Sequence, residues 1–113
     1  MDKQEIFNKV RDHLLSQNAR SAVYGRNLYR GPDGLMCAIG CLIEDSLYTP
    51  EMEHETPDGL HVMGALIKSG IPEEVIHSGL LHDLQLLHDT LEPEDWSLEL
   101  RWIARDHGLR HCR

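Results

Sequence analysis

The sequence predicts a predominantly α-helical protein of the α+β class: a compact single domain over residues 1–113 with about five to six short helices and one small β-hairpin. Three observations support this fold class. Apolar residues recur at helical spacing in most segments. The chain contains one strong turn signal, Gly31–Gly34, which favours a hairpin. Its 113 residues are enough to enclose one hydrophobic core.

Capping signals place the helices. Asp2 is a suitable N-cap for the first one, prolines preceded by threonine suit the first turn of later ones, and glycines close them. The helices are therefore expected over residues 3–18, from Pro50, over residues 56–69, from Pro72, over residues 80–91, and from Pro93 to Gly108.

The segment around the turn signal is expected to form the hairpin and the centre of the core. Residues 24–30 alternate as a strand does, Gly31–Gly34 suits a type I turn with a positive φ at Gly34, and a short return strand follows. Residues 37–45 place apolar side chains on every side of a helical projection, which predicts a fully buried helix.

The same segment, from Tyr29 to Tyr48, follows the pattern YRGPDGxxCAIGCLIxDxxY, and weaker matches follow as far as residues 106–109. This pattern resembles a group of small proteins encoded by bacteriophages and prophages. The group has no established activity, so the resemblance implies no catalytic residue. It implies a phage or prophage setting, in which small proteins often modulate the host or its defences.

The composition predicts a cytoplasmic protein. No apolar run approaches the length of a membrane span, the first residues do not form a signal peptide, and three cysteines do not suit a disulfide framework. Residues 32–100 hold fifteen acidic residues and a single lysine, whereas both ends are basic. This charge argues against nucleic acid as a partner and leaves either a solvated acidic surface or an acidic face for a basic partner.

An anion-binding site at the hairpin is the first candidate for chemistry. Arg26 and Arg30 lie on one face of the expected strand, and Tyr29 lies between them. The amides of the turn, from Gly31 to Gly34, point toward the start of the expected helix, an arrangement that suits phosphate. The ligand would be a phosphorylated small molecule or a signalling nucleotide. Turn formation alone also explains both glycines.

Cysteine and histidine chemistry is the second candidate. Cys37 and Cys41 with His107 and His111 imitate a zinc pattern, but 65 residues separate the pairs, so the two cysteines are expected to be buried core residues without metal. No cofactor is expected. The tail residue Cys112 should react quickly with thiol reagents.

A small Cys/His enzyme is a further alternative. Cys37, His88 and Asp89 supply a nucleophile, a base and an orienting carboxylate, but no local signature unites them. A histidine on an apolar helix face is more often a buried residue with both nitrogens hydrogen-bonded. The sequence therefore leaves catalysis undecided and favours binding.

The last helix has two apolar faces. Trp96, Leu100 and Ile103 form one stripe. Leu98 and Trp102 project from the opposite side, and Arg105, three positions after Trp102, lies next to it on the helix surface. Either the helix is central and both faces are buried, or the second face is a protein interface. The leading hypothesis is a phage accessory protein that inhibits a host or defence factor through this contact, and homodimerisation is also possible.

Overall fold

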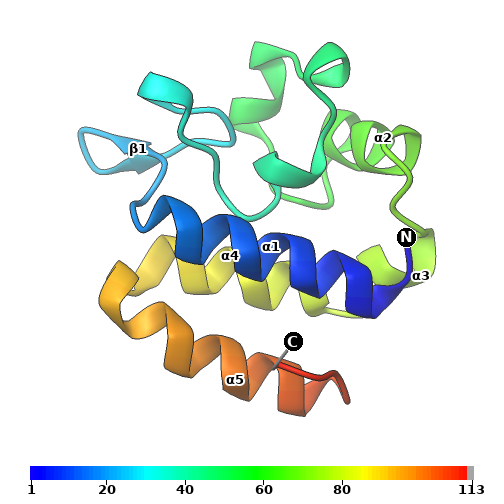
Figure 1. The fold of residues 1–113 in the computed structure, drawn as a ribbon. Coiled ribbons are helices and arrows are strands. Elements are labelled where there is room, and N and C mark those ends of the chain that lie inside the picture. The colour runs from blue at the N-terminus through cyan, green and yellow to red at the C-terminus, as the bar shows by residue number, and fades with distance from the viewer. Residues whose placement is uncertain (112–113) are drawn as a thin grey trace.

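The computed structural model describes residues 1–111 as three layers. α1 (Lys3–Gln17) and α4 (Leu80–Thr90) lie side by side in the middle, and α5 (Trp96–Asp106) packs against both on one side (Figure 1). The other side is covered by the irregular residues 21–59 and by α2 (Leu60–Lys68), while α3 (Glu73–Ile76) leads into α4. The predicted fold class, predominantly α with one small hairpin, is confirmed.

The structure confirms the N-cap and the apolar stripe predicted for the first helix. The Asp2 carboxylate accepts a hydrogen bond from the Glu5 amide (2.8 Å), and the Glu5 carboxylate accepts one from the Asp2 amide (3.0 Å), so both ends of a capping box are closed. Asn18 ends the helix in a left-handed conformation. The buried apolar side chains of α1 are Ile6, Phe7, Val10 and Leu14.

The hairpin lies earlier in the chain than predicted. Its strands are β1 (Ala22–Val23) and β2 (Arg26–Asn27), which pair antiparallel, so residues 24–30 do not form one strand. The chain reverses at Tyr24 and Gly25, both with positive φ. A two-residue loop with two positive φ angles matches the twist of paired strands, which explains why the reversal occurs here.

The turn signal Gly31–Gly34 forms a second reversal of the same kind. Its central residues are Asp33 (φ 58°) and Gly34 (φ 79°), and the Leu35 amide donates to the Pro32 carbonyl (3.1 Å). Two positive φ angles make this turn type I′ and not the predicted type I, as Asp-Gly favours. The turn closes an isolated bridge between Arg30 and Met36.

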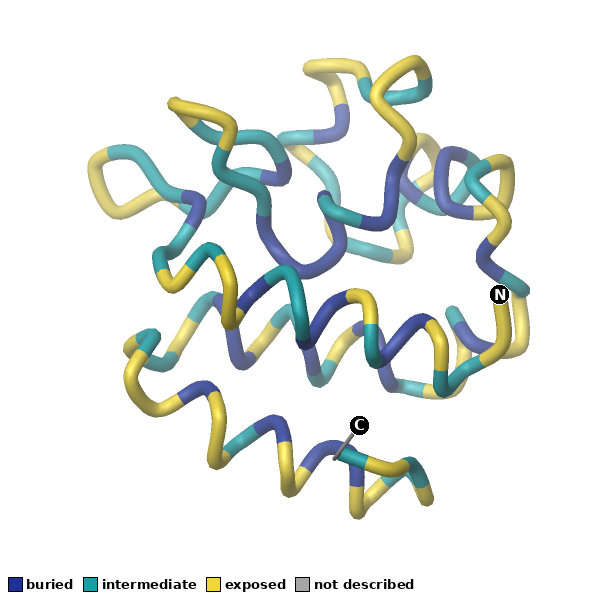
Figure 2. Tube along the Cα trace, in the orientation of Figure 1, coloured by how far each residue is buried: buried dark blue, intermediate teal, exposed yellow. Residues whose placement is uncertain are grey.

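The buried helix predicted over residues 37–45 is wrong in conformation, and its burial is confirmed for residues 37–43, of which Cys41 is partly buried, but not for the exposed Glu44 and Asp45. Only short 3₁₀ turns form there, and Figure 2 shows a buried stretch of chain where this side of the molecule meets the middle layer. Apolar side chains on all sides suit a buried irregular segment as well as a helix, so the pattern did not distinguish them. The 3₁₀ turns of the chain are Pro32–Gly34, Gly40–Leu42, Asp45–Leu47, Pro50–His54 and Pro93–Asp95.

Side chains from the helices supply the hydrogen bonds that this irregular backbone lacks. At the end of α1, the Gln17 side chain accepts from the Met36 amide (3.0 Å) and donates to the Met36 carbonyl (2.9 Å). On α4, the Gln85 side chain accepts from the Ile39 amide (3.0 Å). Buried peptide groups must be paired, so these two glutamines hold the segment in place.

The start of α2 also differs from the prediction. α2 begins at Leu60 and not at Thr56, because residues 56–59 close a turn in which the Gly59 amide donates to the Thr56 carbonyl (2.8 Å). The Glu55 carboxylate then accepts from the first helical amides, His61 (2.9 Å) and Val62 (3.1 Å).

Within residues 1–111, no helix is long and apolar enough to span a membrane.

We predict that Gly40→Ala destabilises the protein by about 3 kcal/mol, because a Cβ at this position would lie 2.0 Å from the Tyr29 carbonyl oxygen, a backbone atom that cannot easily move. Chemical denaturation measures the change. Gly64→Ala in α2 is the matched control: its Cβ meets nothing within 4 Å, so a stability gain of about 0.5–1 kcal/mol is expected from helix propensity. Equal stability of the two variants would contradict the close approach.

Candidate functional site

Arg30, the main residue of the predicted anion site, is bound to the protein's own backbone. Its guanidinium donates to the carbonyls of Gly40 (3.3 Å) and Ile43 (2.5 Å) and pairs with Asp45 (2.6 Å). It also lies over the Tyr48 ring, 5.3 Å from the centroid, with 20% of its side chain exposed. Arg30 therefore works as a clamp for the irregular segment.

The other predicted anion-site residues do not converge with Arg30 on one point. The Arg26 guanidinium is exposed and contacts His54 Nδ1 (3.3 Å). Tyr29 is buried, and its hydroxyl donates to the Glu55 carbonyl (2.7 Å). The Gly31 amide is bonded to the Leu35 carbonyl (2.7 Å) within its turn. Gly34 is exposed at the tip.

A carboxylate of the protein already lies against two amides of this region. Glu53 accepts from the backbone amides of Tyr29 (2.9 Å) and Arg30 (3.1 Å), and from the Tyr48 hydroxyl (2.6 Å). Burial and the Glu53 contact raise the pKa of Tyr48 to about 12. The Glu53 carboxylate thus binds amides in the region where the sequence predicted a phosphate ligand. The anion-site hypothesis stays a prediction.

We predict that Arg30→Lys lowers the free energy of unfolding by about 1–3 kcal/mol. The arginine guanidinium donates to two carbonyls and to Asp45 at once, and the single ammonium of a lysine cannot reach all three acceptors. Arg26→Lys, in the same motif but exposed, should change it by less than about 0.5 kcal/mol. Urea denaturation of both variants makes the comparison. An unchanged stability for Arg30→Lys would remove the structural role and favour a ligand role.

Of the Cys37, His88 and Asp89 constellation, only His88 and Asp89 are hydrogen-bonded to each other, while Cys37 and Asp89 border one small cavity. His88 is fully buried, its Nδ1 donates to Asp89 (2.8 Å), and its Nε2 accepts from the Ser21 amide (2.9 Å). Accepting an amide hydrogen requires a neutral ring, so neither nitrogen is left to activate a thiol. The ring also stacks on Trp96 at 5.7 Å. This histidine supports the fold.

The two core cysteines are free thiols with suppressed acidity. Cys37 is buried and Cys41 is partly buried, and burial raises the pKa of each to about 12. His107 is hydrogen-bonded to Asp83 (2.8 Å) and not to either thiol. Among residues 1–111, no group of three His, Cys, Asp or Glu is placed to hold a metal. Cys112, expected to be reactive, lies outside the described residues.

We predict that stability falls as the pH rises from about 9 to 12, because the unfolded thiols ionise near their usual pKa while the buried ones stay protonated up to about 12. Urea denaturation across this range measures the slope. Cys37→Ala should be less stable at pH 8, from the lost packing, but should lose less further stability above pH 9. Identical slopes in the two proteins would contradict the raised pKa.

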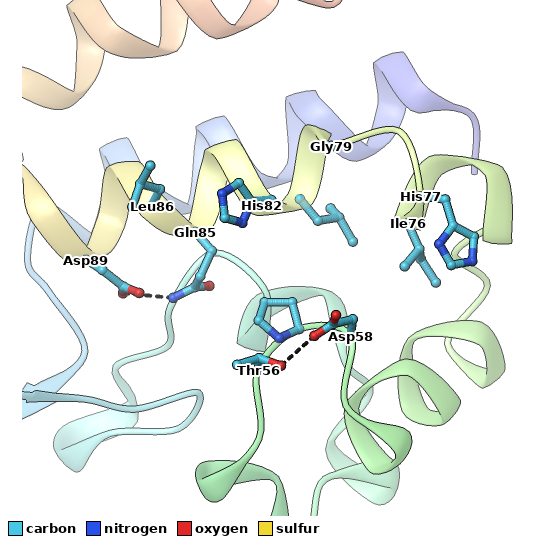
Figure 3. A pocket seen from close by; sticks show the side chains of 11 residues that line it. Thr56, Asp58, Ile76, His77, Gly79, His82, Gln85, Leu86 and Asp89 are labelled. Carbon is cyan, nitrogen blue, oxygen red and sulfur yellow. Dashed lines mark hydrogen bonds between the residues drawn. The ribbon is translucent and has the colours of Figure 1, made fainter.

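A cleft of about 540 Å³ lies between α4 and the loop at residues 56–58 (Figure 3). Pro57, Leu81 and Leu86 supply apolar walls. Asp58 comes from the loop and Asp89 from the facing helix, so two carboxylates from separate elements border one space. The size lies in the range that holds small ligands.

Sequence reasoning missed this cleft. In the sequence, Asp89 stands out only beside His88, and Asp58 lies within the residues that open the helix expected over residues 56–69. The residues that line the cleft come from loop 56–58 and from the chain between α3 and α4, so they meet only through the tertiary fold. A second cavity of about 200 Å³ adjoins it, sharing Gln85 and Asp89 among its walls. No local pattern in the sequence marks either space.

The outer face of α5 is the remaining candidate, and the structure exposes it. Leu98 is 62% exposed and Trp102 is 48% exposed, while Trp96, Leu100 and Ile103 on the opposite side are buried. The Arg105 guanidinium lies over the Trp102 ring, 5.5 Å from its centroid. The alternative that both faces of this helix are core is therefore wrong within the monomer.

Comparison with known proteins adds no further constraint: no family model, no curated protein and no solved structure matches this chain.

Proposed function

We propose that this protein acts by binding another protein through the outer face of α5, formed by Leu98, Trp102 and Arg105. The observation that carries the proposal is the half-exposed Trp102. A tryptophan side chain left in water does not gain the free energy that burial of its apolar surface would give. Tryptophan is also enriched among the residues that dominate binding energy. In this view the exposed ring is an anchor that a partner covers.

The face is arranged before any partner arrives. The buried stripe of Trp96, Leu100 and Ile103 fixes the helix against α1 and α4. Arg105 stacks on Trp102 and restricts the ring, which reduces the entropy lost on binding. A rigid aromatic residue with a neighbouring arginine and an exposed leucine one turn earlier has the composition of an interface centre.

Charge favours an acidic partner surface. Arg101 and Arg105 are exposed beside Trp102, whereas residues 32–100 carry most of the negative charge of the chain. Complementary charge speeds association and selects the partner. A second copy of this chain also offers acidic surface, so self-association is the first quantity to measure.

The setting proposed for this activity is the cytoplasm of a bacterial host. Support comes from the motif spanning Tyr29–Tyr48, which resembles that of phage and prophage proteins. In that setting the partner is a host or defence factor, and the protein inhibits it by covering a surface.

We predict that Trp102→Ala weakens association by about 2 kcal/mol or more while the monomer keeps its melting temperature within a few degrees, since the ring is half exposed. Light scattering and thermal melting on the same samples measure self-association and stability. Capture of host proteins by tagged wild type and variant then shows whether a partner depends on the ring.

Leu60→Ala is the matched control, because Leu60 is an exposed apolar residue on another helix. It should leave association unchanged. If the wild type neither self-associates nor captures any protein that Trp102→Ala loses, the proposed interface is absent. A loss of several kcal/mol of monomer stability on Trp102→Ala would instead assign the ring to the fold.

A further inference from the structure

We propose that the cleft between α4 and the loop at residues 56–58 binds a linear aliphatic diamine. This site is separate from the outer face of α5, and the inference does not depend on the proposed function. It rests on the shape of the cleft, on its charge, and on the way its two carboxylates are held.

The cleft fits a small ligand with an apolar middle. Its volume of about 540 Å³ is within the range of small-molecule sites. Leu81 and Pro57 give it apolar walls, and the side chain of Leu86, 50% exposed, borders the opening. A methylene chain would remove this surface from water.

Asp89 is positioned by neighbours that use only one of its oxygens. Its Oδ1 accepts from Gln85 (2.9 Å) and from His88 (2.8 Å). Gln85 is itself fixed by the Ile39 amide. Within residues 1–111, Oδ2 of Asp89 has no hydrogen bond, so a rigidly held carboxylate keeps one oxygen for a ligand donor.

Asp58 is likewise held in place, on the facing loop. Its Oδ1 accepts from the Thr56 hydroxyl, and its own backbone amide also bonds to the carboxylate, so Asp58 is held by groups of its own loop. The Thr56 bond, together with its own amide, lowers the pKa of this carboxyl, and the nearby His82 adds to the effect. Asp58 therefore stays charged at neutral pH.

Charge selects the ligand class. The residues that line the cleft include no lysine or arginine, and the adjoining cavity adds Glu53 and Glu55. Two histidines, His77 and His82, also line the cleft, but no residue of its lining offers an anion a permanent positive charge. A metal ion is disfavoured because no three ligating side chains converge in the described part of the chain. An organic cation remains, and an ammonium donates three hydrogen bonds to carboxylate oxygens.

Two carboxylates on separate elements favour two ammonium groups. Asp89 lies on α4 and Asp58 on the loop that faces it (Figure 3). A monoamine can reach one of them and leaves the other unpaired. A diamine neutralises both while its methylenes lie along the apolar walls, so one chain length should fit best.

The test is isothermal titration calorimetry on the full chain at low ionic strength, using terminal diamines from propane to hexane and butylamine as the single-charge probe. We expect one diamine length to bind at least about tenfold more tightly than butylamine, which corresponds to two ion pairs in place of one. Asp58→Asn should weaken the affinity for that diamine by about fivefold or more. It should leave the affinity for butylamine within about twofold of its value for the wild type.

Glu94→Gln is the charge-matched control, because Glu94 is exposed in the turn before α5 and does not line the cleft. It should change diamine binding by less than about twofold. Asp89→Asn should act like Asp58→Asn. If it unfolds the protein by disturbing His88, then Asp58→Asn alone decides, since the hydrogen bonds of Asp58 stay within its own loop.

Three results would overturn the proposal. They are no measurable binding at millimolar diamine, affinity that follows ligand charge without any optimum in length, and an equal loss on Glu94→Gln and Asp58→Asn. The last two would mean general attraction to an acidic surface. Trp102→Ala should bind the diamine as the wild type does, so failure of the α5 interface and failure of this site can be told apart.

Discussion

The structure depends on pairing the buried peptide groups of a segment that has almost no regular secondary structure. Residues 28–48 lie against one side of the middle layer with only short 3₁₀ turns and one isolated bridge (Figure 1). Some of their amides and carbonyls bond within the segment's own turns, and side chains satisfy others: Gln17 from α1, Gln85 from α4, and Arg30 from the segment itself. Unpaired buried groups would each cost about 1–3 kcal/mol. These polar side chains are therefore as necessary to the fold as the apolar stripes of the helices.

The same constraint shapes the cleft. Gln85 holds the Ile39 amide with its oxygen and Asp89 with its nitrogen, so one side chain connects the buried segment to the wall of the cavity. His88 links the start of the hairpin, through Ser21, to the same carboxylate. The orientation of Asp89 is thus a by-product of how the irregular backbone is satisfied. Rigidity at this wall needs no additional device.

Much of the helical layer could be predicted from the sequence, because local rules govern it. The Asp2 cap, the stripe of α1 and the two faces of α5 follow from 3.6-residue periodicity, and the exposure of Trp102 resolved the one ambiguity about α5. The segment over residues 37–45 could not be predicted, since its shape is set by partners as distant as Gln85. The cleft shares that limit: Asp58 and Asp89 acquire a common space only through tertiary packing.

The side-chain bonds to the irregular segment also join parts of the chain that are far apart in sequence. The Ser21 amide and His88 are 67 residues apart in sequence, and the Ile39 amide and Gln85 are 46 apart. Closing loops of that length loses entropy before any of these bonds forms, and neither acceptor is in place until α1 and α4 have docked. The segment that carries the sequence motif therefore gains these bonds only when α4 is in place. During translation from the N-terminus this apolar stretch is made before α4, and apolar chain without its packing partners favours aggregation.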